Sequence, residues 1–219
     1  MTVQKDVTVL GGLELDSVAA GVQALDAAVK AAPVTILDAR TVCPGKYLFL
    51  LTGSEASVEA ALADGSEIRH DCILDRIYLS NLHPDVPATL TGAAGADSTG
   101  AAGGGATRGD TADTSRAGAG EPVGGDDDMD ALGVLESYTS FGIVEAADRV
   151  AKAAGVKLLH IRIGDEMGGK ASVKFTGPIS EVEAAIAAGA DVLQAKGVLC
   201  KQVVIPRPDP QIRPFLTRG

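Results

Sequence analysis

The segment LGGLEL at residues 10–15 decides the fold, because the chain repeats it as LGVLES at residues 132–137. Two longer segments follow in the same order in both halves. The first half has DAAVKAAPVTIL at 26–37 and GSEASVEAALADG at 53–65. The second half has DRVAKAAGVKLL at 148–159 and GPISEVEAAIAAG at 177–189. The offset between the copies is 122 residues at first, and 124 after a two-residue insertion. Motifs that recur in order indicate a duplicated domain. We therefore expect two related domains of about ninety residues each.

Residues 91–129, between the copies, have a composition unlike the rest of the chain. This stretch holds 11 of the 27 glycines, seven acidic and two basic residues, and no Leu, Ile or aromatic residue. Such a segment buries too little apolar surface to offset the entropy of ordering its backbone. The sequence therefore predicts a first domain at 1–90, a flexible acidic Gly/Ala-rich linker at 91–129, and a second domain at 130–219.

Each copy has the pattern of a small α+β domain. In the first copy, apolar or alternating segments predict strands at residues 7–15, 34–40, 46–52 and 73–80. Between the first two strands, four residues recur at the spacing of an amphipathic helix: Val18, Val22, Leu25 and Val29. A second helix is predicted over about 54–63. This order of strands and helices is that of a ferredoxin-like sandwich, in which helices cover one face of an antiparallel sheet.

Capping signals mark where these helices begin. Asp16 or Ser17 is placed to cap the first helix, and Lys30 in its last turn suits the helix dipole. In the second copy, Ser180 and Glu183 have the spacing of a capping box. The second helix of that copy is therefore predicted to begin at Ser180.

Composition disfavours several classes of protein. A formal net charge of −10 argues against nucleic-acid binding, which depends mainly on Lys and Arg. Three cysteines at uneven spacings, Cys43, Cys72 and Cys200, do not have the pattern of a disulfide framework. The N-terminal residues lack a secretory signal, and the longest apolar run, residues 47–51, is too short to span a bilayer. We expect a soluble intracellular protein that binds neither nucleic acid nor membrane.

These motifs together resemble the bacterial-microcompartment (BMC) shell domain. The resemblance rests on LGxLE, an Ala-rich helix ending DAAVKAA or DRVAKAA, a Gly-containing hairpin, a second Ala-rich helix and the closing VIPRP. Two such domains in one chain are similar to the tandem shell proteins, and TVCPGKYLFLLTG is most similar to their propanediol-utilisation type. The resemblance implies two tandem ferredoxin-like BMC domains, a pseudohexameric homotrimer, a place in a cytoplasmic microcompartment shell, and no enzymatic activity.

The resemblance also implies partners and contact residues. The partners are further copies of the chain, other hexameric and pentameric shell proteins, and encapsulated enzymes. In the family, a Lys after the first helix and the Arg of a PRP motif make the contacts between tiles; these correspond here to Lys30, Lys152 and Arg207. NLHP in the first domain aligns with IPRP in the second, so His83 is expected in place of the arginine. Alternatively, the lysines are ordinary surface residues that suit the helix dipole.

In the family, the loop after the second strand of each domain rims a pore at the symmetry axis. The corresponding residues here are Val42, Cys43, Pro44 and Gly45 in the first domain, and Asp165, Glu166, Met167 and Gly168 in the second. Three Cys43 thiolates would converge at a threefold axis, and similar proteins hold a 4Fe–4S cluster in this way. The resemblance therefore implies that Cys43, one per chain, ligates a 4Fe–4S cluster for electron transfer. The alternative is an inert free thiol.

Asp165 and Glu166 give the second loop a different character. Two carboxylates per chain, six in a trimer, would favour passage of neutral or cationic metabolites. Alternatively, both acids are solvated and face bulk water.

Two other functions remain open from the sequence. A ferredoxin-like trimer can also be a small-molecule-binding regulatory protein, because a fold does not determine a function. The segment HDC at 70–72 contains nucleophile and base types, but adjacency in sequence does not create a catalytic geometry. No catalytic residue is predicted.

Overall fold

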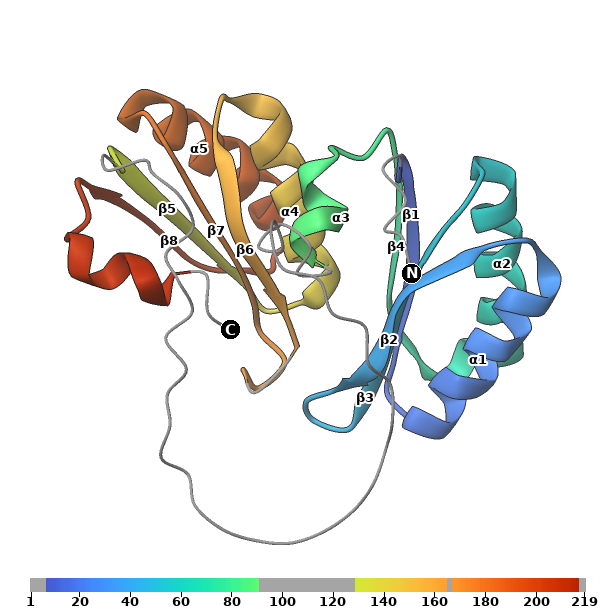
Figure 1. Cartoon of the computed structure of the whole chain (residues 1–219). Coiled ribbons are helices and arrows are strands. Elements are labelled where there is room, and N and C mark those ends of the chain that lie inside the picture. Colours follow the sequence, from blue (N-terminus) through green and yellow to red (C-terminus); the bar gives the residue numbers. More distant parts are fainter. Residues whose placement is uncertain (1–6, 91–128, 165–166, 217–219) are drawn as a thin grey trace, which may run out of the picture.

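The computed structural model describes residues 7–90, 129–164 and 167–216, and it contains the same α+β unit twice (Figure 1). The elements of the first unit are β1 (Val9–Leu15), α1 (Val18–Ala31), β2 (Thr35–Val42), β3 (Lys46–Thr52), α2 (Glu55–Ile68), η1 (His70–Cys72), β4 (Ile73–Ser80) and α3 (Asp85–Leu90). Those of the second are β5 (Ala131–Ser137), α4 (Ser140–Ala153), β6 (Lys157–Ile163), β7 (Ala171–Gly177), α5 (Ile179–Ala195), β8 (Leu199–Pro206) and η3 (Pro210–Phe215).

Each unit has one four-stranded antiparallel sheet, ordered β2-β3-β1-β4 in the first and β6-β7-β5-β8 in the second. This order confirms the predicted ferredoxin-like sandwich. Strands β3 and β4 begin and end where the sequence predicted, at 46–52 and 73–80, whereas β2 continues past its predicted end at residue 40 to Val42. The predicted linker lies outside the described residues except for Met129. Among the helices of the described ranges, none combines the length and the hydropathy needed to cross a bilayer.

The helices pack closely on one face of each sheet. A Cβ added at Gly11 would lie 2.4 Å from Cγ1 of Val58 on α2. The next residue, Gly12, faces the other way, because a Cβ there would meet Leu50 and Ile77. Successive residues of a strand point to opposite faces. Leu50 and Ile77 therefore lie on the helix-free face of the first sheet.

Helix α1 does not bury the face that its valines predicted. The N-cap is Ser17, whose Oγ accepts a hydrogen bond from the Ala20 amide at 3.4 Å. The residues that α1 buries are small: Ala20, Gly21, Ala24 and Ala28. A Cβ added at Gly21 would lie 2.4 Å from Cβ of Tyr47, so the helix approaches the sheet too closely for larger side chains. Of the four residues at helical spacing, Val18, Val22 and Val29 are exposed, and only Leu25 packs against the core.

The predicted capping box at the start of α5 was also wrong. The helix begins at Ile179 with Pro178 as its N-cap, so Ser180 already lies inside the first turn. The Ile179 amide donates instead to Oδ2 of Asp130 at 2.8 Å. A carboxylate that is distant in sequence thus supplies the acceptor that a capping box provides locally.

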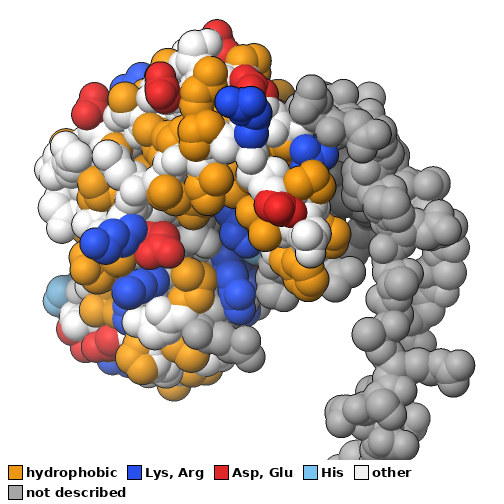
Figure 2. Space-filling model, turned by 90° about the vertical axis from the view of Figure 1, so that its left-hand side faces the viewer, with side chains coloured by type: hydrophobic (Ala, Val, Ile, Leu, Met, Phe, Trp, Pro, Cys, Tyr) orange, Lys and Arg blue, Asp and Glu red, His pale blue; other side chains and the backbone are white. Residues whose placement is uncertain are grey.

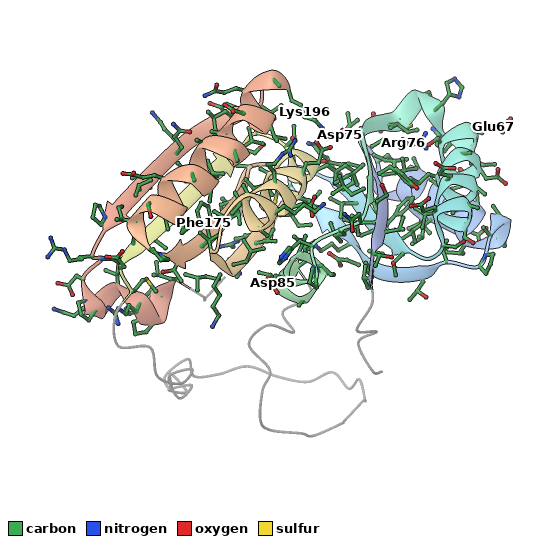
Figure 3. The ribbon with its side chains drawn as sticks, turned by 90° about the horizontal axis from the view of Figure 1, so that it is seen from above. Glu67, Asp75, Arg76, Asp85, Phe175 and Lys196 are labelled. Carbon is green, nitrogen blue, oxygen red and sulfur yellow. The ribbon has the colours of Figure 1, made fainter. Side chains whose placement is uncertain are left out.

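The two domains pack against each other through unlike faces. One continuous apolar cluster joins Leu10, Leu50 and Ile77 of the first domain to Phe141 and Val144 on α4 of the second. Helix α3, which carries Asp85, lies between the domains (Figures 1 and 3) and packs against α4 and β6. The helix-free face of the first sheet thus lies toward the helical side of the second domain.

Candidate functional site

The first predicted pore loop is the β2–β3 hairpin. Val42 is buried, while Cys43, Pro44 and Gly45 are exposed at the tip. Gly45 has φ of +79°, and a Cβ there would meet open space. Cys43 carries a free thiol. The hairpin therefore presents this thiol to solvent in a single chain.

The second predicted pore loop joins β6 and β7. Three of its residues are glycines in the left-handed region: Gly164, Gly168 and Gly169, with φ of +71°, +62° and +86°. The Lys170 amide donates to the Met167 carbonyl at 3.2 Å and closes the turn. Asp165 and Glu166 lie outside the described residues, so the acidic ring stays a prediction.

The structure brings the two loops together. The Cys43 amide donates to the Gly164 carbonyl at 3.2 Å. A Cβ added at Gly164 would lie 2.6 Å from Cγ1 of Val42, and one at Gly169 would lie 3.5 Å from the Cys43 carbonyl oxygen. Residues more than 120 positions apart therefore form one contiguous surface around Cys43.

Charged residues that the sequence analysis missed hold this surface in place. Lys46 forms an ion pair of 2.9 Å with Glu14, whose side chain is only 3% exposed. The Lys46 ammonium lies 3.9 Å from the position of a Cβ at Gly169. Arg40 donates to the Ile163 carbonyl at 3.4 Å across the domain boundary. An acidic residue within the apolar strand LGGLEL was the available signal, because buried carboxylates are usually paired.

Lys152 and His83 belong to the contact between the domains. Oδ2 of Asp148 accepts from Lys152 at 2.6 Å, and its Oδ1 accepts from the His83 backbone amide at 2.8 Å. In the first domain, Lys30 forms the matching bond of 2.6 Å with Asp26. The Lys30 and Asp26 side chains are 72% and 59% exposed, whereas those of Lys152 and Asp148 are 33% and 11% exposed.

The expected equivalence of His83 and Arg207 is corrected by strand register. β1 pairs with β4 at Val9 and Ser80, and β5 pairs with β8 at Ala131 and Pro206. The next residues, Asn81 and Arg207, are the non-glycine residues with positive φ in the described ranges, at 55° and 45°. Asn81 is therefore the counterpart of Arg207. The prolines of NLHP and IPRP do not occupy equivalent positions, because the segment that precedes β4 differs in length from the one that precedes β8.

The segment at 70–72 does not form a catalytic arrangement. The Arg69 guanidinium lies 3.2 Å from the Asp71 carboxylate and 3.1 Å from the Cys72 sulfur. Desolvation and a hydrogen bond with Asp16 raise the pKa of the Cys72 thiol. A nucleophilic cysteine needs the opposite shift, toward the thiolate. Within the described ranges, no three His, Cys, Asp or Glu side chains are grouped to hold a metal ion.

Two apolar surfaces are exposed that have buried counterparts in the same chain. On α1, Val22 is 51% exposed, whereas its counterpart on α4, Val144, is fully buried. On β8, Val203 is 45% exposed, whereas Ile77 at the same register on β4 is fully buried. Three other exposed apolar residues lie on β2 and η3: Ile36, Ile212 and Phe215. Figure 2 shows hydrophobic side chains gathered on the side of the second domain that faces away from the first.

Comparisons with known proteins agree on one family. A BMC domain is matched twice, at residues 9–81 and 131–208. The chain is 30% identical to the bacterial microcompartment shell protein PduT of Citrobacter freundii, over 91% of this chain and 92% of that protein. It is 40% identical to the shell protein EutM of Salmonella typhimurium over 36% of this chain and 81% of EutM. A crystal structure of a microcompartment protein from Desulfitobacterium hafniense is 32% identical, with a TM-score of 0.74 over 94% of this chain and 98% of that one.

Proposed function

The chain belongs to the BMC domain family, and on this basis we propose that it is a structural shell protein of a cytoplasmic bacterial microcompartment, assembled as a homotrimer of pseudohexameric shape. One observation carries the assembly of chains into a ring: each of the two surfaces that the domains bury against each other has an exposed counterpart elsewhere in the chain. The number of chains in the ring comes from the pseudohexamer that the family resemblance implies.

The exposed surfaces match as a pair. Within the chain, the helix-free face of the first sheet covers α4. The helix-free face of the second sheet and the outer face of α1 both keep apolar side chains exposed, including Val203 and Val22. If the contact within the chain is repeated between chains, these two surfaces meet. A head-to-tail contact that repeats closes a ring when its rotation divides a full turn. The pseudohexamer that the resemblance implies has six domains, which correspond to three chains.

The hydrogen bonds between the domains predict matching bonds between chains. Arg40 donates to the Ile163 carbonyl, so its counterpart Arg162 is expected to donate to Thr41 of the next protomer. Asp148 accepts from the His83 amide, so Asp26 is expected to accept from a backbone amide close to Arg207 of a neighbouring protomer. In such a ring the two loops alternate around the axis, and Cys43 occurs three times.

The surface around Cys43 fits the 4Fe–4S cluster that the family resemblance implies. Its thiol is free and exposed, and it lies at the tip of a hairpin that contacts the second loop. Three such thiols would supply three ligands and leave one iron for a non-cysteine ligand. A bound cluster would supply one-electron transfer through the tile. Passage of small metabolites through the same pore is the alternative use, and the acidic pair at 165–166 would favour neutral or cationic metabolites.

Tile edges are proposed to carry Lys30, Lys152 and Arg207, with Asn81 in place of the arginine on alternate edges. Lys30 and Asp26 are exposed, while Lys152 and Asp148 are partly covered by the first domain. In the proposed ring Asp26 gains the contact that Asp148 already makes, so the two kinds of edge differ chemically in Asn81 against Arg207. Other hexameric and pentameric shell proteins are the expected neighbours, and encapsulated enzymes are expected on one face.

The trimer and the tile are tested separately. Light scattering after gel filtration should give three times the 22.1 kDa mass of the chain. A stable monomer or dimer would contradict the proposal. Electron microscopy of the protein, alone and with hexameric shell proteins, should show sheets, tubes or closed shells. Discrete trimers that never tile and bind a metabolite would instead support the regulatory protein.

Iron analysis and electron paramagnetic resonance test the cluster on anaerobically prepared protein. Cys43→Ser should lose the iron and its signal while the trimer remains. Cys200→Ser is the matched control, because Cys200 is half-buried on β8 and should leave both unchanged. Iron retained at wild-type level in Cys43→Ser would show that Cys43 is not a ligand.

A further inference from the structure

The segment that follows β8 repeats the backbone turn that follows β4. The Val86 amide donates to the His83 carbonyl at 3.0 Å, and the Ile212 amide donates to the Asp209 carbonyl at 3.0 Å. The offset between the two copies is 126 residues at both positions, as it is for the two positive-φ residues that begin the turns. Ile212 is therefore the counterpart of Val86, and η3 is the counterpart of α3.

The side chains that begin the two helices also have the same role. Nδ1 of His83 accepts from the Asp85 amide at 3.3 Å, and Oδ1 of Asp209 accepts from the Gln211 amide at 2.8 Å. A side-chain acceptor at the start of a helix takes up an amide that has no partner within the helix. The two segments are therefore structural copies, although α3 is an α-helix and η3 is a 3₁₀ helix.

The two copies differ in what covers their apolar side chain. Val86 is fully buried and belongs to the apolar cluster that joins the domains. Helix α3 packs against α4 and β6, which both belong to the second domain. Ile212 is 38% exposed, and η3, drawn in red in Figure 1, lies on the side of the second domain that faces away from the first. The copy after β8 thus keeps exposed a surface that the copy after β4 buries.

Hydrogen bonds fix η3 to the second domain on both sides. Before it, the Arg207 amide donates to the Asp130 carbonyl at 2.7 Å. After it, Lys174 donates to the Leu216 carbonyl at 3.1 Å. Lys174 has the register position of Leu50, on the helix-free face of its sheet. The helix is therefore held at the face that the proposed ring turns toward the next chain, and little further ordering is needed for it to bind there.

The surface that corresponds to the site of α3 lies on α1 and β2, which are the counterparts of α4 and β6. On β2, Ile36 is 44% exposed. Leu158, at the same register position of β6, is 4% exposed and belongs to the apolar cluster between the domains. The register is shifted directly after both residues, so the two strands have the same local shape. Strand β2 therefore keeps an apolar surface that a segment of another chain can cover.

We propose that η3 is a clasp between chains: Ile212 packs on β2 and α1 of the next protomer, beside Ile36, as α3 packs on β6 and α4 within one chain. The inference rests on the proposed trimer and names the segment that joins each chain to the next. The contact is head-to-tail, because η3 of one chain meets a different surface on its partner.

The size of the effect follows from the exposed part of Ile212. The substitution Ile212→Ala removes three carbon atoms from a side chain of which 38% is still available to a partner. Burial of that fraction corresponds to about a fivefold stronger contact. Three contacts in a closed ring multiply to about a hundredfold in the association constant of the trimer.

Sedimentation equilibrium of the full-length protein at neutral pH measures this constant. Ile212→Ala should lower it about a hundredfold, and Ile212→Asp should lower it further, because a charge is then desolvated in the contact. Gln211→Ala is the matched control: Gln211 is exposed on the same helix and should leave the trimer unchanged. Ile36→Ala should also weaken the trimer, and the double variant should lose less than the two single losses combined, because both remove the same contact. Circular dichroism checks the fold of each variant.

The outcomes separate the clasp from the trimer. Absence of a wild-type trimer would overturn the proposed assembly and the clasp with it. A wild-type trimer whose association constant is unchanged in Ile212→Ala and Ile212→Asp would overturn only the clasp. Fully additive losses from Ile36→Ala and Ile212→Ala would show that η3 does not dock beside Ile36. An Ile212→Asp trimer of unchanged strength that no longer forms sheets or tubes would place η3 at a contact between tiles, which also contradicts the proposal.

Discussion

Replacing Val22 by alanine should weaken the trimer without destabilising the single chain. Val22 is 51% exposed on α1, while Val144 at the same position of α4 is fully buried by the first domain. The substitution removes two methyl groups, worth about 1.6 kcal/mol when fully buried, and about half of that is still available to a partner. The loss is therefore about 0.8 kcal/mol per contact, or about 2.4 kcal/mol for the three contacts of a closed ring.

A loss of this size corresponds to a roughly fifty-fold lower association constant for the trimer. Sedimentation equilibrium over a range of protein concentrations measures it. Val22→Asp should abolish the trimer, because it places a charge in an apolar contact. Gln23→Ala is a nearby control at an exposed position on α1. Thermal melts should show that Val22→Asp still folds. A trimer of unchanged strength in Val22→Asp would refute the argument that this face of α1 meets another chain.

Three further predictions concern the stability of the chain and are measured by urea denaturation in the monomeric Val22→Asp background. Asp148→Ala should lower the free energy of unfolding by about 1–3 kcal/mol, because Lys152 and the His83 amide lose their acceptor. At the exposed counterpart, Asp26→Ala should change the free energy of unfolding by less than about 0.5 kcal/mol. Glu14→Ala should lower the free energy of unfolding by about 2 kcal/mol by leaving Lys46 unpaired. Glu136→Ala should cost less, because the contact of Glu136 within the described residues is a 3.8 Å one with the Cys200 sulfur. Equal losses would show that the Glu14 pair does not stabilise the hairpin. Gly133→Ala should lower the free energy of unfolding by about 1–3 kcal/mol, because its Cβ would lie 2.3 Å from Phe175. The added Cβ of Gly168→Ala meets open space, so this variant should lose about 1 kcal/mol through its positive φ alone. The reverse order would contradict the packing of Gly133 on β5.

The duplication made most of the fold predictable. Two copies of each motif fix the order of strands and helices twice, and the apolar segments LGGLEL and KYLFLLT give strand positions within a few residues. The burial of α1 was not predictable in the same way. Periodicity shows that a helix has two faces, but the distance between helix and sheet, set here at Gly21 and Tyr47, decides which face fits.

The candidate site was predictable as a set of loops and not as a network of contacts. Family resemblance pointed to Cys43 and its neighbours, and the bond from the Cys43 amide to Gly164 now joins the two loops. The pairing of Glu14 with Lys46 depends on strand register, which spacing along the sequence does not reveal. The same holds for the equivalence of Asn81 and Arg207, because it follows from β-pairing and not from the order of prolines.

The two adjoining hairpins also differ in a way that affects stoichiometry. A ring of six identical subunits can present a given side chain at its hub only in six copies or in none. Here the first hairpin carries a thiol and the second carries none in its described part, so the proposed ring of three chains presents three thiols and not six. Joining two diverged domains in one polypeptide thus lowers the symmetry order from six to three, and it permits coordination numbers that an undivided hexamer lacks.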